Sequence, residues 1–499
     1  MAQVLADADG GQPSSSNLPP SSVAIKHSVD PVTRIHHSHG HTCREVWQLR
    51  KGQLPRVADA VVWPLTEDAV ADVVAAAAAA DVVLMPYGGG TSVTNALTLP
   101  ERDAEPRPIV VVSMAKLNAV LDVDTVNMTA TIQAGAVGAV LGKELADGWG
   151  VTMGHEPDSY EFSTLGGWIA TRASGMQKNV YGNIEDIVIS VTLVTPTGTV
   201  VKDAVVPRIS AGPDIHHLVL GSEGTLGIIT SAIVKVRPLP AVRKYGALIF
   251  PDFDAGVAAM YDIAQAHAAP ASIRLVDNNQ FQMGQALKPP TSWFASAIAA
   301  AKKFYVLSIK GFEADTMVAA TLLFLGNSDA DIAAQEAALY PIAARHGGMP
   351  ADEENGRRGY ALTFMIAYIR DLAFQYCFLA ESFETSVPWS GVRHLCTSVK
   401  AAIVDAAAAR SIPREPFVTC RVTQTYDTGA CFDEIEHIAR VAILDAGGSI
   451  SHHHGIGKHR ASFMPHVQSP AANAALRAVK RELDPTNVFA SGNVLPAKL

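Results

Sequence analysis

The sequence predicts an α+β fold built from two domains. Its 499 residues exceed what one hydrophobic core usually supports, and a composition of 48% hydrophobic and 17% charged residues is typical of a globular protein. From Val57 to Pro238, short β-branched runs alternate with glycine-rich turns and helical stretches. After Pro238 and Pro240 the pattern changes to longer alanine-rich helical periods broken by apolar runs. We therefore expect an α/β domain followed by a second, α+β domain that caps it.

The expected domain boundaries follow these changes in composition. Residues 1–24 are rich in Gly, Pro and Ser and cannot bury enough apolar surface to fold, so they are a predicted disordered leader. The other expected segments are an N-terminal segment 25–56, the first domain 57–238, the cap domain 239–450, and a C-terminal part 451–499 that holds a histidine triplet, a helix and a tail.

Strands and helices are predicted from short local patterns. Runs of β-branched and other apolar residues predict strands at 81–86, 109–113, 129–133, 187–194 and 305–309. Alanine has the highest helix propensity, so the alanine-rich stretches 71–80 and 401–409 are predicted helices.

Charge and cysteine content exclude several classes of protein. A net charge of −9 argues against a protein held on nucleic acid by phosphate neutralisation, although a local basic pocket for one phosphate stays open. The five cysteines form no C-x-x-C pair, which indicates a reducing compartment and no structural disulfide. The longest apolar run, near 73–80, is far too short to span a bilayer. We expect a soluble or at most peripheral protein.

Three consecutive glycines follow the predicted strand 81–86, in the segment Pro86-Tyr87-Gly88-Gly89-Gly90-Thr91-Ser92. Without Cβ atoms, such a turn exposes successive backbone N–H groups, and a nest of this kind binds a pyrophosphate. The spacing differs from the G-x-G-x-x-G fingerprint of dinucleotide-binding folds. A plain tight turn is the alternative, and the triplet does not decide between the two by itself.

Further glycines and hydroxyl residues recur downstream in a fixed order. They supply hydrogen-bond donors and allow close backbone approach, as a flat isoalloxazine ring and a diphosphate both require. The segments are Gly154 to Ser159, Phe162 to Gly167, Thr171 to Gly175 and Gly221 to Ile229.

In this order the segments resemble the FAD domain of the vanillyl-alcohol-oxidase family. The resemblance implies a two-subdomain FAD-binding domain of the vanillyl-alcohol-oxidase type with an α+β cap domain. Members with covalently held flavin often carry a histidine in the loop equivalent to 86–92, and this loop has none. We therefore predict non-covalent FAD, with His155 as the only nearby candidate for a covalent link.

A closer resemblance covers almost the whole chain, from about His36 to Leu495. The segments that carry it are Gly40-His41-Thr42, Gly182 to Asp186, Gly212 to His217, Ala271 to Leu275, Ala367 to Asp371, Thr419 to Tyr426, and Ser451 to Gly455. Together they resemble the alkyldihydroxyacetonephosphate synthase family of ether-lipid biosynthesis.

This resemblance implies a transferase with no net oxidation. Members convert acyl-dihydroxyacetone phosphate and a long-chain fatty alcohol into alkyl-dihydroxyacetone phosphate and a fatty acid, by way of an adduct at flavin N5. It also implies a homodimer, and it leaves peripheral contact with a membrane open. The terminal Ala497-Lys498-Leu499 is close to the S-K-L import signal, which predicts a peroxisome or a glycosome.

The resemblance assigns FAD contacts to four segments of the first domain. They are Pro86, Tyr87, Gly88, Gly89, Gly90, Thr91 and Ser92; Asp158, Ser159, Tyr160, Glu161, Phe162, Ser163 and Thr164; Thr171, Arg172, Ala173 and Ser174; and Glu223, Gly224, Thr225, Leu226, Gly227, Ile228 and Ile229. Ser491 to Leu495 also matches a C-terminal stretch that the family needs.

The remaining site residues are implied in the same way. Arg370 binds the substrate phosphate, Arg274 supports the flavin and the active-site geometry, and His452, His453 and His454 line the reacting centre. The residue types make chemical sense, because guanidinium pairs with phosphate oxygens through a planar fork and imidazole titrates near neutrality. A zinc site at the triplet is the alternative, but no Cys, Asp or Glu partner spacing accompanies it, so we predict no metal.

Some polar residues have plainer interpretations. The N-terminal histidines His36, His37, His39 and His41 are expected to form a polar turn. Arg172 and Arg421 are each open to an interpretation as ordinary ion-pair residues.

One departure from the family affects catalysis. In the family, the segment equivalent to Thr425 to Cys431 continues into an aromatic-rich strand whose first tyrosine is the proposed acid/base residue. Here Phe432 and Asp433 follow Cys431, and we expect the strand and its return loop to be missing. Either Tyr426 or a histidine then transfers the proton, or the chain is an impaired flavin-binding partner, or the sequence is a shortened gene product. A flavin-dependent 2-hydroxy-acid dehydrogenase is a further alternative.

Overall fold

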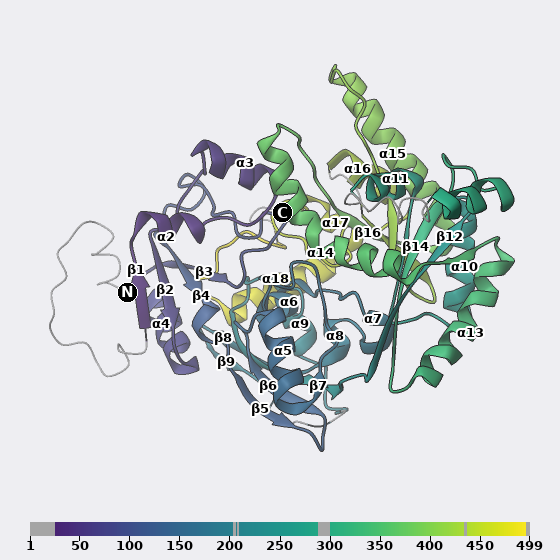
Figure 1. Ribbon diagram of the computed structural model, residues 1–499. Coiled ribbons are helices and arrows are strands. Elements are labelled where there is room, and N and C mark those ends of the chain that lie inside the picture. The colour runs from purple at the N-terminus through teal and green to yellow at the C-terminus, as the bar shows by residue number, and fades with distance from the viewer. Residues whose placement is uncertain (1–24, 203–205, 207–208, 288–299, 434–436, 496–499) are drawn as a thin grey trace. The chain divides into compact units, whose positions relative to one another are not determined.

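The computed structural model describes residues 25–202, 206, 209–287, 300–433 and 437–495, so the predicted leader and the terminal tripeptide lie outside the described residues. The chain divides into two compact units (Figure 1). The first unit contains the chain up to Gly175, Tyr181–Leu239 and the chain from His453; the second contains Met176–Val180 and Pro240–His452. The polypeptide therefore passes into the second unit twice, first at 176–180 and then at 240–452, and returns to the first unit each time.

The N-terminal sheet of the first unit has the strand order β1-β2-β4-β3, with β2, β4 and β3 parallel and β1 antiparallel to β2. In β4, Val110 and Val112 join one hydrophobic cluster while Ile109 and Val111 join another, as expected for a strand buried on both faces. Its strands and helices are β1 Ile25–Ser28, α2 Pro31–His36, α3 Cys43–Lys51, β2 Ala60–Pro64, α4 Glu67–Ala79, β3 Val83–Tyr87, β4 Ile109–Ser113 and the 3₁₀ turn η2 Met114–Lys116.

The other large sheet of the first unit is antiparallel and has the order β5-β6-β10-β8-β9. Its strands are β5 Val120–Asp124, β6 Thr129–Gln133, β8 Val188–Thr195, β9 Gly198–Val200 and β10 Ile228–Lys235, and β7 Val151–Thr152 pairs separately with β11 Arg237–Pro238. The remaining helices are α5 Gly138–Trp149, α6 Leu165–Thr171, α7 Lys178–Tyr181, α8 Ile184–Ile187, α9 His216–Val219, η5 Ala461–Phe463, α17 Met464–Val467 and α18 Pro470–Leu483.

A single antiparallel sheet of seven strands forms the second unit, in the order β15-β12-β14-β13-β17-β18-β16. The strands are β12 Val242–Phe250, β13 Ser272–Val276, β14 Val318–Gly326, β15 Met349–Ala351, β16 Glu384–Pro388, β17 Arg421–Thr425 and β18 Gly429–Asp433. The helices are α10 Phe253–Gln265, α11 Asn278–Ala286, η3 Tyr305–Ile309, α13 Asp329–Arg345, α14 Glu353–Gln375, η4 Trp389–Gly391, α15 Val392–Ala409 and α16 His437–Asp445.

The two faces of this sheet differ in their cover. Alternate residues of β14, such as Leu322 and Phe324, join the large core formed with α10, α13 and α15, and α10 lies beside α13 (Figure 1). Leu323, on the opposite face, packs with Tyr360 of α14. The unit therefore has an apolar core on one face and the single long helix α14 on the other.

Most predicted elements are found, with two corrections. The strands predicted at 109–113 and 129–133 match β4 and β6, those at 81–86 and 187–194 shift by one or two residues, and both alanine-rich helices are present within α4 and α15. The strand predicted at 305–309 is wrong, because Tyr305–Ile309 forms a π-helical turn whose ends Tyr305 and Ile309 are exposed. A short apolar run does not separate strand from helix by itself.

The second correction concerns the strand expected to be missing after Cys431. A five-residue strand, β18, runs from Gly429 to Asp433 and pairs with β17 on one side and β16 on the other. The sheet therefore stays continuous at this point and is not left with the open edge that loss of a strand would produce.

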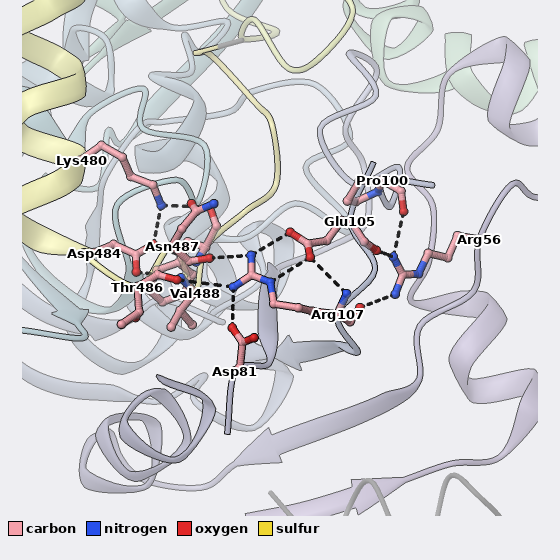
Figure 2. A network of polar contacts seen from close by, with 11 residues as sticks. Arg56, Asp81, Pro100, Glu105, Arg107, Lys480, Asp484, Thr486, Asn487 and Val488 are labelled. Carbon is pink, nitrogen blue, oxygen red and sulfur yellow. Dashed lines mark hydrogen bonds and ion pairs between the residues drawn. The ribbon is translucent and has the colours of Figure 1, made fainter. Parts of the chain in front are cut away.

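A polar network fastens the C-terminal segment to the N-terminal sheet of the first unit (Figure 2). The guanidinium of Arg107 contacts Glu105 at 2.7 Å and Asp81 at 3.2 Å, and donates to the carbonyl oxygen of Asn487 at 3.1 Å. The ammonium of Lys480 donates to the carbonyl oxygen of Phe489 at 3.1 Å. The segment from Lys480 to Phe489 is therefore part of the first unit's folded structure.

Candidate functional site

The four segments that the sequence assigns to FAD all lie in the first unit. Residues 86–92 begin at the end of β3, residues 158–164 precede α6, residues 171–174 follow its last turn, and residues 223–229 lead into β10. Each is a loop at the end of a strand or helix, where backbone groups are available to a ligand.

The first two of these loops are in direct contact. A Cβ added at Gly89 would lie 2.0 Å from the carbonyl oxygen of Phe162, and one added at Gly88 would lie 2.6 Å from Oγ1 of Thr164. Such distances are closer than any side chain tolerates, so only glycine lets the loops approach in this way. The glycine triplet therefore packs one flavin loop against the next.

The fourth segment joins the same cluster. The backbone N–H of Glu223 donates to the carbonyl oxygen of Ala170 at 2.9 Å, and a Cβ on Gly224 would lie 3.3 Å from the ring of Pro86. Arg172 follows α6 directly and lies 3.7 Å from the Cβ position of Gly221. The structure thus brings all four segments together.

The glycine loop offers the donors that a diphosphate needs. Among the hydrogen bonds within the described residues, none is donated by the backbone N–H groups of Gly89, Gly90 or Thr91. Gly90 has φ +73°, and a left-handed residue in a turn makes adjacent N–H groups converge into a nest. The residues present therefore fit the diphosphate of FAD.

Three residues of the assigned segments other than glycine have a left-handed backbone. Ser159 has φ +54°, Arg172 has φ +53° and Glu223 has φ +48°. This conformation costs free energy for residues with a Cβ and persists where surrounding contacts enforce it, often at ligand sites. The contacts within this loop cluster therefore enforce an unusual backbone conformation at three positions.

His155 is deeply buried beside these loops. Only 2% of its surface is exposed, and its ring centroid lies 5.2 Å from that of Trp168. Burial lowers the pKa of His155 to about 3, so the imidazole is neutral at physiological pH. Within the described residues neither ring nitrogen has a hydrogen-bond partner. Non-covalent FAD remains our prediction.

Glu223 connects the flavin loops to the segment after the histidine triplet. Its carboxylate accepts hydrogen bonds from the backbone N–H groups of Ile456 at 2.5 Å and Gly457 at 2.7 Å. Burial raises the pKa of Glu223 to about 7, although these two hydrogen bonds act in the opposite direction. Asn493 donates to the carbonyl oxygen of Glu223 at 3.1 Å and accepts from Lys458 at 3.0 Å, so the stretch Ser491–Leu495 also contacts this segment.

Two histidines of the triplet lie against a flavin segment. His453 Nε2 is 3.7 Å from Oδ2 of Asp158, and the His453 and His454 rings are 4.5 Å apart. The donor atoms of Asp158, His453 and His454 lie within 4.8 Å of one another. The prediction of no metal assumed that the triplet has no acidic partner, whereas the fold supplies Asp158; the absence of a metal stays a prediction.

His452, which belongs to the second unit, contacts Tyr426. The phenolic oxygen lies 2.6 Å from Nε2 of His452, and the hydroxyl donates to Oε1 of Gln424 at 2.9 Å. The backbone N–H of His452 donates to Oε2 of the buried Glu384 at 2.5 Å, and Ser451 donates to Oε1 at 3.1 Å. The phenol and the imidazole, both predicted catalytic, thus share a hydrogen bond on a rigid support.

The two predicted arginines are related through α14. Arg274, on β13, donates to Oγ1 of Thr363 at 2.6 Å. Thr363 and Arg370 are seven residues apart on α14, so they lie on one stripe of the helix, and both are buried. The guanidinium of Arg370 is 3.6 Å from Asp371. One stripe of α14 therefore carries the buried Arg370 and, through Thr363, contacts the buried Arg274.

The plainer predictions concern two arginines and the N-terminal histidines. Arg172 forms an ion pair with Glu185 at 3.3 Å, as expected, and Arg421 is buried on β17. Nδ1 of His37 lies 2.8 Å from the carbonyl oxygen of Thr33, and Nδ1 of His39 lies 2.7 Å from that of Gly40, as expected of a polar turn.

Sequence reasoning missed several polar residues near the predicted ones. Lys178 and Glu384 contact Tyr426 and His452, and Lys458 contacts Asn493. Only Lys458 carried a signal, as a cation in the glycine-rich stretch directly after the triplet. The other two are far from their partners along the chain.

Two family models match consecutive parts of the chain. The FAD binding domain family matches residues 58–204, and the C-terminal domain of FAD linked oxidases matches residues 239–494. FAD is therefore the cofactor, in agreement with the prediction.

Whole-chain comparisons are more specific. The chain is 44% identical to alkyldihydroxyacetonephosphate synthase of Caenorhabditis elegans, over 94% of this chain and 81% of that protein. A solved structure of an alkyldihydroxyacetonephosphate synthase superposes with a TM-score of 0.80 at 29% identity, covering 99% of this chain and 88% of that one.

A more distant likeness concerns the fold alone. Substrate-bound p-cresol methylhydroxylase superposes with a TM-score of 0.69 at 12% identity, covering 96% of this chain and 95% of that one. The predicted fold class, an FAD-binding domain of the vanillyl-alcohol-oxidase type with an α+β cap, is confirmed. This chain belongs to the alkyldihydroxyacetonephosphate synthase family.

Proposed function

We propose that this protein replaces the acyl chain of acyl-dihydroxyacetone phosphate by a long-chain fatty alcohol and releases the fatty acid. The family membership supports the reaction, and one structural observation carries the proposal at the residue level. In the second unit, buried arginines and a hydrogen-bonded phenol–imidazole pair occur together, as an anionic substrate that must lose and regain a proton requires. The overall reaction exchanges an ester for an ether with no net oxidation.

Arg370 is the proposed phosphate anchor. A guanidinium offers a planar fork that pairs with two phosphate oxygens, and a partly buried cation binds an anion more strongly than an exposed one. Arg274 is the proposed supporting residue, since its bond to Thr363 connects β13 to the helix that carries Arg370.

FAD is proposed to bind non-covalently to the four loops of the first unit. When bound, its isoalloxazine ring supplies an electron-accepting group that the protein's side chains lack. The loops bind the diphosphate through backbone N–H groups and orient the ring. Asp158, His453 and His454 are proposed to hold charge and protons beside it.

Tyr426 and His452 are the proposed acid/base pair. The carbon between the ketone and the ester of the substrate must lose a proton, and either the phenolate or the neutral imidazole can accept it. The hydrogen bond of 2.6 Å lets the proton pass between them.

The outer face of α14 supports peripheral membrane contact. Met365, Tyr368 and Leu372 are exposed at helical spacing, and Tyr376 and Leu379 continue the apolar surface beyond the helix end. A contiguous exposed apolar surface is uncommon on soluble proteins and suits a lipid interface, from which a long-chain alcohol would come. No helix in the described part of the chain is both long and apolar enough to cross a bilayer.

Two further proposals concern assembly and location. The protein works as a homodimer, as the family resemblance implies. The terminal Ala497-Lys498-Leu499 directs it to a peroxisome or a glycosome.

Exchange of labelled hexadecanol into acyl-dihydroxyacetone phosphate tests the reaction. The purified FAD-loaded protein should form labelled ether product and release one fatty acid for each alcohol consumed, without any electron acceptor. Oxidation of a 2-hydroxy acid that depends on an added acceptor would overturn the proposal in favour of a dehydrogenase. Tight FAD binding with neither activity would indicate a non-catalytic flavin-binding partner.

A further inference from the structure

Lys178 approaches the predicted catalytic tyrosine from a distant part of the chain. Its ammonium nitrogen lies 3.4 Å from the ring centroid of Tyr426 and donates to the carbonyl oxygen of Thr425 at 2.5 Å, although these residues are 247 positions apart. All three residues belong to the second unit. The lysine is therefore part of the surroundings of Tyr426 itself.

An ammonium group at this distance has two physical effects on a phenol. It is attracted to the ring face, which restrains the ring, and its positive charge stabilises the phenolate relative to the neutral hydroxyl. A lysine that served only to donate to the carbonyl oxygen of Thr425 would not have to lie over the Tyr426 ring. Its position over the ring therefore favours a role toward the phenol over a purely structural role.

The other side of Tyr426 faces a proton acceptor. Its hydroxyl has one proton, which points either to Oε1 of Gln424 at 2.9 Å or toward Nε2 of His452 at 2.6 Å. When Nε2 is protonated, it donates to the phenolic oxygen instead. Glu384 holds the backbone of His452 in place through its N–H. Ammonium, phenol and imidazole therefore form a connected chain.

The remaining charged groups near this chain come from neighbouring elements. Asp427 follows Tyr426, and its carboxylate lies 3.8 Å from the exposed His267 after α10. Trp389 of η4 donates to the carbonyl oxygen of Tyr426 at 2.8 Å and carries no charge. Lys178 supplies a fixed positive charge at the face of the Tyr426 ring.

We infer that Lys178 is a positioning residue for proton transfer in the proposed reaction, holding the Tyr426 ring and stabilising the phenolate that accepts the substrate proton. This inference rests on the proposed function. In this step, a C–H bond breaks at the substrate carbon that lies between the ketone and the ester. Its electron pair enters the ketone carbonyl to form an enolate, and the proton bonds to the phenolate oxygen of Tyr426. His452 Nε2 then shares that proton, and the reverse transfer returns it to the product.

Removal of the charge tests the inference. Lys178→Met keeps the length of the side chain, and kcat should fall about tenfold to a hundredfold, part of what one positioned acid/base group contributes. The limb of the kcat–pH profile that reports the base should move to higher pH, while KM for acyl-dihydroxyacetone phosphate and the flavin spectrum stay unchanged. Lys178→Arg should restore most of the rate.

A double-mutant cycle separates this role from a structural one. Lys178→Met added to Tyr426→Phe should lower kcat little beyond Tyr426→Phe alone, because the lysine acts through the phenol. Lys310→Met is the matched control, since Lys310 lies 5.7 Å from the Tyr305 ring centroid in the same unit, and it should leave kcat unchanged. Full additivity of the two losses, or a Lys178→Met loss equal at all pH values, would overturn the inference.

A readout without turnover keeps the inference distinct from the proposed reaction. With ¹³Cζ-labelled tyrosine, the signal absent from Tyr426→Phe identifies Tyr426 by NMR, and it should titrate at higher pH in Lys178→Met than in the unmodified protein. An identical titration in both would overturn the role of Lys178 even in an active enzyme. A shifted titration in a protein that exchanges no hexadecanol would support Lys178 and overturn the proposed reaction instead.

Discussion

The carboxylate of Glu223 accepts the backbone N–H of Gly457 at 2.7 Å, which ties a flavin loop to the segment after the histidine triplet. The pKa of Glu223 is raised to about 7 by burial, above the ordinary 4.5. The folded state therefore binds a proton that the unfolded state releases between these pH values. Stability from this group is fully present below about pH 4.5 and is lost as the pH rises to about 7, by about 3 kcal/mol.

Glu223→Gln isolates this contribution. The difference in unfolding free energy between the protein and the variant should change between pH 5 and pH 8, with the variant having the flatter profile. Urea unfolding at both pH values, in the FAD-free form, measures it. Parallel profiles for the two proteins would show that Glu223 does not titrate in this range.

His155 should change the free energy of unfolding with pH in the opposite direction to Glu223. Its pKa of about 3 lies below the ordinary 6.5, so the unfolded state binds more protons as the pH falls. The contribution of the neutral His155 to the free energy of unfolding is fully present above about pH 6.5, and about 2 kcal/mol of it is lost by pH 5. His155→Phe keeps a ring against Trp168, and its thermal unfolding midpoint should depend less on pH between 7.5 and 5. An unchanged dependence would contradict the buried neutral imidazole.

Gly89→Ala should abolish FAD retention. The new Cβ would lie 2.0 Å from the carbonyl oxygen of Phe162, so the two flavin loops must separate. Gly148→Ala in α5 is the control, because its Cβ meets no atom within 4 Å and a helical Gly to Ala change stabilises by up to about 1 kcal/mol. Flavin absorbance after gel filtration measures retention, and full occupancy in the Gly89 variant would refute the loop contact.

Arg370→Lys should raise KM for acyl-dihydroxyacetone phosphate about tenfold, because lysine keeps the charge but loses the fork. The flavin spectrum should not change. Lys302→Met in the same unit, whose ion pair with Asp352 at 2.5 Å is exposed, is the control and should leave KM unchanged. Steady-state kinetics over a range of substrate concentrations measures both, and an unaltered KM for Arg370→Lys places the phosphate site elsewhere.

The lack of the family's tyrosine after Cys431, where Phe432 and Asp433 follow, should limit the rate. Inserting the aromatic strand of a family relative after Cys431 should raise kcat by about 10²- to 10⁴-fold, the usual contribution of one acid/base group. Changing its first tyrosine to Phe should cancel the gain, and FAD binding should be the same throughout, since no flavin loop lies there. If the unmodified protein already matches the restored one, Tyr426 and His452 suffice.

Local patterns predicted the parts of the fold that depend on local physics. The residues of a single segment were enough to identify the strand Ile109–Ser113 from its β-branched run and the helices α4 and α15 from their alanine content. Tyr305–Ile309 has strand-like residues but no neighbouring strand to pair with among the described residues, and the chain forms a helical turn there. Pairing partners are a property of the tertiary fold, and a single segment does not encode them.

The same limit applies to the site. Glycine and hydroxyl content identified the flavin loops, because a diphosphate selects residue types that are visible in sequence. The reason for Gly89 was only partly predicted: we expected the missing Cβ to expose backbone N–H groups, and the structure adds that a Cβ would meet the carbonyl oxygen of Phe162. Lys178 was beyond prediction, since nothing local connects it to Tyr426.

The return of the chain to the first unit sets an order for its biosynthesis. Glu223 and the carbonyl oxygen of Thr225 find their partners, Gly457 and Lys480, in the part of the chain that is synthesised last. A ribosome that has made the first 239 residues has produced every flavin loop but none of these contacts. The contacts that complete the fourth flavin loop therefore form only after the segment from His453 has been synthesised.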